Sequence, residues 1–211
     1  ILPDVLRSGT RYEKWRVMIN NTCIVKKVKL LGQFDQFADI DVFSMELTKR
    51  KNTIRSTHVR FEKERPKQTQ TIADYFDVSV GPVVDNRDPL QGRALGYVVS
   101  KGLLGWNEET KVSRRRLHSG KSFSGPFVVV KRTSRKGDSH RAIATIINVP
   151  RPVYVDNHLI ILKPKSNNLK DCKRILSLLQ NKATDDWIDS QIRCRHLTVK
   201  IVSNIPIPNN F

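Results

Sequence analysis

The stretch that decides the fold is GPFVVVKRTSRKGDSHRAIATIINVP, residues 125–150. It contains two runs of mostly β-branched residues, FVVV and ATII, on either side of a polar segment that is rich in Arg, Lys and Ser. β-branched and aromatic residues favour strands, whereas Gly, Ser and Asp favour turns and loops. The pattern therefore predicts two strands that are joined by a long basic loop.

Towards the C-terminus, this pair of strands is followed by one more predicted strand and two predicted helices. VYVDNHLIILKP, residues 153–164, predicts a strand that its final proline stops. NLKDCKRILSLLQN, residues 168–181, places apolar residues at the i, i+3, i+4, i+7 spacing of a buried helix face. TDDWIDSQIRCRHL, residues 184–197, predicts a second helix with Thr184 as its N-cap and two aspartates in its first turn.

Towards the N-terminus, TIADYFDVSVGPVV, residues 71–84, predicts a helical turn followed by a strand. LGYVVSKGLLGW, residues 95–106, predicts another extended segment. Residues 51–70 are polar and charged and contain Pro66, which is typical of a linker. These boundaries predict one mixed α/β domain over residues 71–211.

Residues 1–50 form a separate block that is too small to enclose a core of its own. We expect a helix over about residues 8–20, a half-exposed strand over 23–32, and a strand over 38–50 with both faces partly apolar. A strand of the last kind lies inside a sheet that is covered on both sides. The chain also begins on apolar Ile1, so we expect this block to be the end of a larger α/β layer. The expected fold class is α+β.

The charge balance points to a polyanionic partner. The 211 residues carry a formal net charge of +18, with a pI near 10.2. Nucleic acid is favoured over a membrane surface, because no basic amphipathic helix stands out. No apolar run approaches the ~20 residues of a membrane span. The three cysteines show no CxxC spacing, so we expect neither a disulfide framework nor a zinc site, and a cytoplasmic location fits best.

The densest positive charge lies between Lys111 and Arg141, where ten basic residues stand against one acid, Asp138. Arg can bind a phosphate, or the O6/N7 edge of guanine, through two parallel hydrogen bonds. The alternative interpretation is a solvent-exposed loop whose positive charge serves only solubility. We predict a DNA-contacting role for nine of the ten: Arg114, Arg115, Arg116, Lys121, Lys131, Arg132, Arg135, Lys136 and Arg141.

No catalytic centre is visible in the sequence. The chain has no Gly-x-Ser-x-Gly, Walker or HExxH motif. No two of the histidines have metal-ligand spacing, so we expect satisfied or exposed histidines at His118, His140, His158 and His196. We therefore predict no catalytic residue and no metal site in this chain.

Taken in order, these blocks resemble the C-terminal part of gamma-class N6-adenine-specific DNA methyltransferases of restriction–modification systems. ILPDVLRSGTRYEKWRVMI and CIVKKVKLLGQFDQFADIDVFSMELTKR look like the end of the S-adenosylmethionine-dependent catalytic fold, with Arg16 as the late arginine of its helix. IADYFDVSVGPVV, LGYVVSKGLLGW, FVVVKRTSRKG and HLTVKIVSNIPIP look like the target recognition domain. The resemblance implies a methyltransferase-sheet remnant at residues 1–50, a linker at 51–70 and a target recognition domain at 71–211.

The resemblance also assigns roles to single positions. It implies that an aromatic residue stacks on the flipped adenine, with Phe34 and Phe37 as candidates beside the alternative that both are core aromatics. Lys101 is similar in position to a family residue that reaches into the DNA groove, where the family often has Arg. The Asn/Asp-Pro-Pro-Tyr/Phe tetrapeptide and the cofactor loop would lie upstream of Ile1. S-adenosylmethionine is therefore implied for the parent protein, and this chain is expected to hold no cofactor.

The sequence thus predicts duplex DNA recognition as part of an adenine-specific methyltransferase, with double-stranded DNA and the missing N-terminal catalytic domain as partners. Two alternatives stay open. One is a stand-alone DNA specificity subunit, and the other is an RNA-binding protein, which charge alone suggests.

Overall fold

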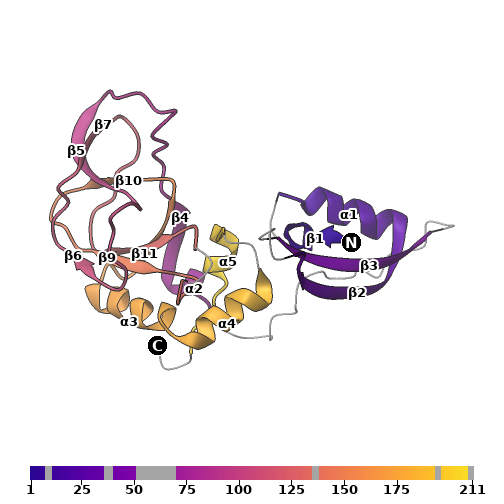
Figure 1. The fold of residues 1–211 in the computed structure, drawn as a ribbon. Coiled ribbons are helices and arrows are strands. Elements are labelled where there is room, and N and C mark those ends of the chain that lie inside the picture. Colours follow the sequence, from indigo (N-terminus) through magenta and orange to yellow (C-terminus); the bar gives the residue numbers. More distant parts are fainter. Residues whose placement is uncertain (8–10, 36–39, 51–69, 135–137, 193–195, 209–211) are drawn as a thin grey trace. The chain divides into compact units, whose positions relative to one another are not determined.

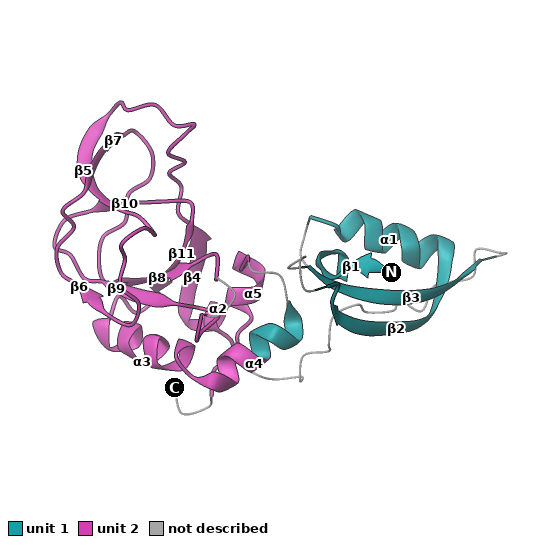
Figure 2. Cartoon of the chain, in the orientation of Figure 1, with its two compact units in different colours: residues 1–67, 187–194 teal, residues 68–186, 195–211 magenta. Residues whose placement is uncertain are grey.

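A computed structural model describes residues 1–7, 11–35, 40–50, 70–134, 138–192 and 196–208. The chain divides into two compact units, which Figure 2 shows in separate colours. Unit 1 comprises residues 1–67 and 187–194, and unit 2 comprises residues 68–186 and 195–211. The fold class is α+β, as the sequence predicted.

Unit 1 contains a three-stranded antiparallel sheet with strand order β1-β3-β2 (Figure 1). Its elements are β1 (Leu2–Pro3), the short 3-10 helix η1 (Asp4–Arg7), α1 (Glu13–Thr22), β2 (Cys23–Gln33) and β3 (Asp41–Lys49). The two long strands match the sequence prediction, and the helix begins later than expected. That this sheet is the remnant of a methyltransferase sheet stays a prediction.

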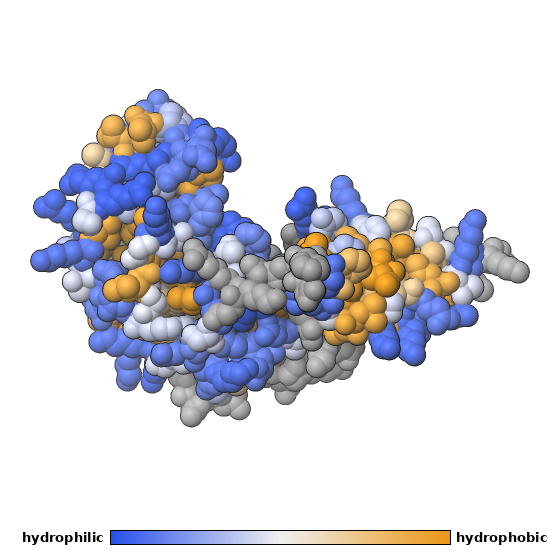
Figure 3. Space-filling model, viewed as in Figure 1, coloured by the Kyte–Doolittle hydropathy of each residue, from blue (hydrophilic) through white to orange (hydrophobic). Residues whose placement is uncertain are grey.

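The first fifty residues of unit 1 bury little apolar surface. Among its described residues 1–50, the only buried hydrophobic side chains are Val42 and Phe43, both on β3. Ten of the thirteen exposed large hydrophobic residues of the described chain lie in the same block. Figure 3 shows apolar residues gathered on the visible surface of this unit. The described residues of this block thus bury two hydrophobic side chains, and that the block lacks a core of its own stays a prediction.

Unit 2 combines two sheets with helices. A five-stranded sheet has the order β4-β11-β8-β9-β6, and a smaller sheet has the order β10-β5-β7. The strands are β4 (Phe76–Val80), β5 (Arg93–Val98), β6 (Glu108–Glu109), β7 (Arg115–His118), β8 (Phe127–Lys131), β9 (Ala144–Ile147), β10 (Val153–Val155) and β11 (Leu159–Pro164). The helices are α2 (Ile72–Tyr75), α3 (Leu169–Leu179), α5 (Val199–Ser203) and the first half of α4 (Lys182–Gln191), whose residues from 187 onwards belong to unit 1.

In the strand pair that opened the sequence analysis, β8 is the middle strand of the five-stranded sheet and β9 lies beside it (Figure 2). β8 pairs with β9 in antiparallel register, with Phe127 opposite Ile147. Alternate residues of β8 face opposite sides of the sheet. Phe127 and Val129 pack in a cluster with Val153 and other residues of the smaller sheet. All apolar residues of β8 are fully buried, which explains why the run is continuously hydrophobic.

The predicted strand over residues 153–164 is wrong as a single element. It splits into β10, which pairs in parallel with β5, and β11, which pairs with β4 and β8. The break is a tight turn in which the Leu159 amide donates to the Asp156 carbonyl at 3.0 Å. Asp and Asn favour such turns, and Asp156 is followed here by Asn157.

The helix that was predicted from Thr184 begins earlier, at Lys182. The Asn181 side chain accepts a hydrogen bond from the Ala183 amide at 2.9 Å, which is the bond of an N-cap. The Thr184 hydroxyl instead donates to the Leu178 carbonyl at 2.7 Å. Thr184 therefore ties α4 to the end of α3 and is not a cap.

The C-terminal segment closes unit 2. Thr198 caps α5 by accepting a hydrogen bond from the Ile201 amide at 3.2 Å. Beyond α5, the Ile72 amide donates to the Ile205 carbonyl, and the Ile207 amide donates to the Gln70 carbonyl. The isoleucines of the IPIP segment are both buried. The two ends of unit 2 are thus hydrogen-bonded to each other.

Candidate nucleic-acid interface

Two adjoining hollows on unit 2 are both lined by residues of the turn that follows β5. The larger one, here called the basic hollow, has a volume of about 640 Å³. It is lined by Ser100, Lys101, Gly102, Lys131, Thr133, Asp138, Ile143 and His158. The second hollow, of about 390 Å³, is lined by Lys101 and Gly102 as well, and its other charged lining residues are Glu109, Lys111 and Arg114. Lys101 therefore borders both hollows.

Local structure fixes the elements around the basic hollow. Gly102 has a φ of +81°, so the turn after β5 needs a residue that tolerates a left-handed conformation. Lys131 is the last residue of β8, and its amide donates to the Ile143 carbonyl across the start of the basic loop. His158 lies in the turn between β10 and β11. Three segments that are distant in sequence thus meet at one surface.

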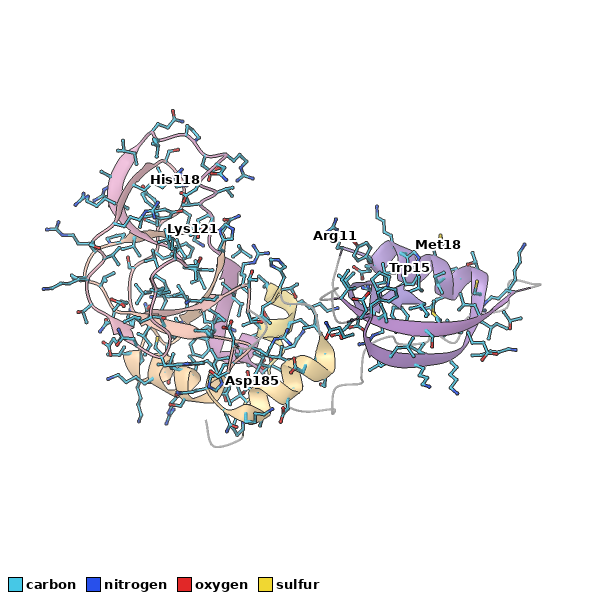
Figure 4. All side chains as sticks on the ribbon, in the orientation of Figure 1. Arg11, Trp15, Met18, His118, Lys121 and Asp185 are labelled. Carbon is cyan, nitrogen blue, oxygen red and sulfur yellow. The ribbon has the colours of Figure 1, made fainter. Side chains whose placement is uncertain are left out.

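The lysines at these hollows have no internal acidic partner. Among the described residues, Lys101, Lys111 and Lys131 form no ion pair and no side-chain hydrogen bond. Lys121 has its ammonium 5.0 Å from the centroid of the Phe123 ring and is exposed (Figure 4). Such side chains can bind an anionic ligand without first breaking a bond inside the protein.

Arg116 belongs to the interior of unit 2 instead. Its side chain is 8% exposed, and it donates to Asp85 Oδ1 at 2.6 Å and to the Asp88 carbonyl at 2.8 Å. Its guanidinium lies 5.5 Å from the centroid of the Tyr97 ring. Burial, followed by the hydrogen bond to Asp85, raises the pKa of Tyr97. This geometry makes Arg116 a structural residue and does not support the predicted phosphate contact.

The other predicted arginines differ in how exposed they are and in which groups of the protein they bind. Arg114 is half exposed, with its guanidinium 3.9 Å from an Asp85 carboxylate oxygen. Arg115 is exposed and donates to the Ala94 carbonyl at 2.9 Å. Arg132 donates to the Asn157 carbonyl at 2.8 Å and is only partly exposed. Arg114 and Arg115 can still reach a ligand, whereas Arg132 serves to hold a turn.

Arg141 and the basic loop are attached to helix α4 through Asp185, which is buried (Figure 4). The Arg141 amide donates to Asp185 Oδ1 at 2.7 Å, and His140 Nδ1 lies 2.9 Å from Asp185 Oδ2. The His140 ring also packs edge-on against Trp106, with centroids 5.0 Å apart. Asp185 therefore anchors the end of the loop, a role that its sequence position in a helix did not indicate.

Three predicted contact residues, Arg135, Lys136 and Phe37, lie outside the described residues. Phe34 lies at the end of β2 and is 60% exposed, so it is not a core aromatic. Its proposed stacking on an adenine stays a prediction. In the part of the chain that the structure describes, no three His, Cys, Asp or Glu residues are grouped as metal ligands.

Sequence reasoning missed Thr133 and His158, which line the basic hollow, and Asp85, which pairs with Arg116. Thr133 follows the predicted basic residues Lys131 and Arg132 directly, and that was the one available signal. The other two residues are brought in by tertiary contacts, which no spacing in the sequence reveals.

No family model matches this chain, and no curated protein matches it. Two solved structures are similar to it in part. One is from a study of complex assembly and conformational transition of the type I R-M system, with 15% identity and a TM-score of 0.45 over 69% of this chain. The other is the HsdS subunit from Thermoanaerobacter tengcongensis, with 16% identity and a TM-score of 0.41 over 69% of this chain.

This chain spans only about a third of those two chains, 35% and 34% of their lengths. Among the helices of the described residues, none has the length and apolar content that crossing a membrane requires.

Proposed function

We propose that this chain recognises duplex DNA in a sequence-specific manner within a restriction–modification system, and that unit 2 provides the DNA-contacting surface. The observation that carries the proposal is the convergence of Lys101, Lys111 and Lys131 on two adjoining hollows, without an acidic partner among the described residues. The formal net charge of +18 supports the same class of ligand. The assignment to restriction–modification rests on the sequence resemblance.

The chemistry of the hollows favours a polyanion over a small cofactor. S-adenosylmethionine carries a positive sulfonium, which two lysines in one hollow would repel. The basic hollow therefore does not fit that cofactor. In this proposal, methyl transfer to adenine belongs to a catalytic domain outside this chain, and the chain alone is expected to transfer no methyl group to DNA.

Two forms of the proposal differ in where that catalytic domain lies. It either precedes this sequence in the same polypeptide, or it belongs to a separate methyltransferase that works with a specificity subunit. The exposed apolar residues of unit 1 support a protein partner in both forms, because scattered single residues are normal but ten within fifty positions are not. The reading frame upstream of Ile1 distinguishes the two forms.

The proposal is tested by titrating a labelled mixed-sequence duplex with the protein at several salt concentrations. Each phosphate that is contacted should contribute a slope of about −0.9 to log K against log salt. Replacing both Lys101 and Lys131 by Ala should weaken binding by about tenfold or more. It should also reduce the salt slope by the amount that corresponds to about two phosphate contacts. The matched control replaces Lys170 and Lys173, which lie on α3, and should stay within about twofold of the wild type.

A flat salt response of the wild-type protein would contradict the proposal, and so would preferential binding of structured RNA in competition with duplex DNA. Sequence specificity has its own readout. Repeated selection of bound duplexes from a random pool should yield one dominant site.

A further inference from the structure

The turn between β10 and β11 is held from several sides. The Asp156 amide donates to the Val98 carbonyl at 3.0 Å, and the Asn157 amide donates to the Val83 carbonyl at 2.8 Å. Arg132 binds the turn twice, through its guanidinium to the Asn157 carbonyl and through its amide to the His158 carbonyl. The turn is therefore a rigid support, although it presents an exposed side chain.

That side chain is His158, which is 67% exposed and lines the basic hollow. Its Nδ1 lies 3.0 Å from Asp156 Oδ1 and 3.2 Å from Oδ2, and the Asp156 side chain is 8% exposed. Because a carboxylate oxygen can only accept a hydrogen bond, Nδ1 carries the proton. Asp156 thereby fixes the ring, and Nε2 is the nitrogen left for a ligand.

The charged groups around His158 are mixed in sign, with a positive excess on the ligand side. Lys101 and Lys131 line the same hollow, as does Asp138. Arg132 binds the backbone of the turn, and the Asp156 carboxylate faces Nδ1 at the edge of the ring. The Thr133 hydroxyl adds a further hydrogen-bonding group, which lies 3.1 Å from His196 Nδ1. Two ammonium groups, a hydroxyl and an oriented imidazole match the acceptors of a phosphate group.

We propose that the basic hollow holds a phosphodiester group of the DNA backbone and that His158 binds it as an imidazolium. This inference rests on the proposed DNA-binding function. A phosphate oxygen only accepts hydrogen bonds, so His158 Nε2 must carry a proton to bind it. Nδ1 keeps its own proton, which it donates in the hydrogen bond to Asp156. The proton on Nε2 must therefore come from solution, so DNA binding takes up one proton at this site.

The direction of the pH dependence follows from the linkage between proton binding and DNA binding. Because the complex binds one more proton than the free protein, affinity is greatest at low pH and falls as pH rises. A single proton limits the change to about tenfold per pH unit. Lysines and arginines stay charged over this range and contribute no such slope.

The experiment measures the affinity of the full chain for a labelled mixed-sequence duplex between about pH 6 and pH 8 at constant salt. The wild-type affinity should fall by about three- to tenfold over this range. His158→Gln keeps an amide donor that does not titrate, so its affinity should change by less than about twofold. His196→Gln, at an exposed histidine that does not line the hollow, should keep the wild-type pH dependence. Thermal unfolding at both pH values shows that each variant is folded.

The outcomes are distinguishable. If the wild-type chain binds no duplex at any pH, the proposed function itself is wrong. If it binds, but wild type and His158→Gln share the same pH dependence, the DNA-binding function stands and the role of His158 is overturned. Loss of the pH dependence in His196→Gln alone would assign the proton to His196 and would equally overturn the inference.

Discussion

Arg116 and Lys101 carry the same charge but do different work in unit 2. Arg116 is bonded to Asp85 and to the Asp88 carbonyl, and removing a buried charge partner leaves the other groups unsatisfied. Arg116→Ala should therefore lower the free energy of unfolding by about 1–3 kcal/mol. Denaturant titration measures this change. Arg115→Ala is the control, because Arg115 is exposed and makes one bond to a carbonyl, and it should change stability by less than about 0.5 kcal/mol. Equal stability of the two variants would contradict the structural role of Arg116.

Cys172 and Cys23 should differ in reactivity. Cys172 is buried in α3, and burial raises the pKa of its thiol to about 12. The thiolate is the nucleophile, so a raised pKa leaves almost none of it at neutral pH. Iodoacetamide should alkylate the half-buried Cys23 of the native protein well before Cys172, and both at similar rates after denaturation. Peptide mass spectrometry reads out each site, and early labelling of native Cys172 would contradict its burial.

At the scale of residues, the sequence predicted where positive charge is dense, but not which charges are free. Arg114, Arg115 and Arg116 are adjacent in the sequence and look equivalent there. They differ because β7 alternates its side chains, and because Asp85, about thirty positions away, pairs with Arg116 at 2.6 Å. Only tertiary structure separates a structural arginine from one that can meet a ligand.

At the scale of elements, substitutions of two glycines test whether the turns around the basic hollow have separate roles. A Cβ at Gly81 would lie 2.1 Å from the Asp156 carbonyl oxygen, which belongs to the turn that presents His158. Gly81→Ala should therefore cost about 1–3 kcal/mol or more, because backbone must move. Gly102→Ala meets no atom within 4 Å but has a φ of +81°, so it should cost about 1–2 kcal/mol.

The two variants should also differ in their effect on the DNA titration. Gly81→Ala shifts the support of His158 and should reduce the pH dependence of binding. Gly102→Ala changes the turn that carries Lys101 and should reduce the salt slope. Denaturant titration measures the stability of each variant, and the binding titration measures its pH dependence and salt slope. Identical changes in both variants would contradict the separate roles of the two turns.

Elements that have a clear local sequence pattern were predicted correctly. Elements whose limits depend on tertiary contacts were not. β8 and β9 follow from continuous β-branched runs, and α3 follows from its apolar spacing. Residues 153–164 look like one strand because apolar residues continue across Asp156 and Asn157. In the structure, the two halves belong to different sheets, which a local pattern cannot encode.

At the scale of the whole molecule, residues 1–67 and residues 68–211 should differ in their ability to fold alone, with residues 187–194 of unit 1 retained in the longer segment. Unit 2 encloses a cluster of ten buried hydrophobic residues drawn from both of its sheets, and its two ends are hydrogen-bonded to each other. The first fifty residues bury only Val42 and Phe43 among their described hydrophobic side chains. A segment with so little burial cannot offset the conformational entropy of folding, which costs about 1–2 kcal/mol per residue for the backbone.

A fragment of residues 68–211 should therefore unfold in a single cooperative transition and keep the salt-dependent binding of duplex DNA. A fragment of residues 1–67 should show no cooperative transition and should bind a hydrophobic dye. Circular dichroism melts and dye fluorescence measure both expectations, with the intact chain as the reference. A cooperative melt of the 1–67 fragment would show that its exposed apolar residues need no partner. Loss of DNA binding in the 68–211 fragment would move the interface away from the basic hollow, because that fragment retains every residue that lines it.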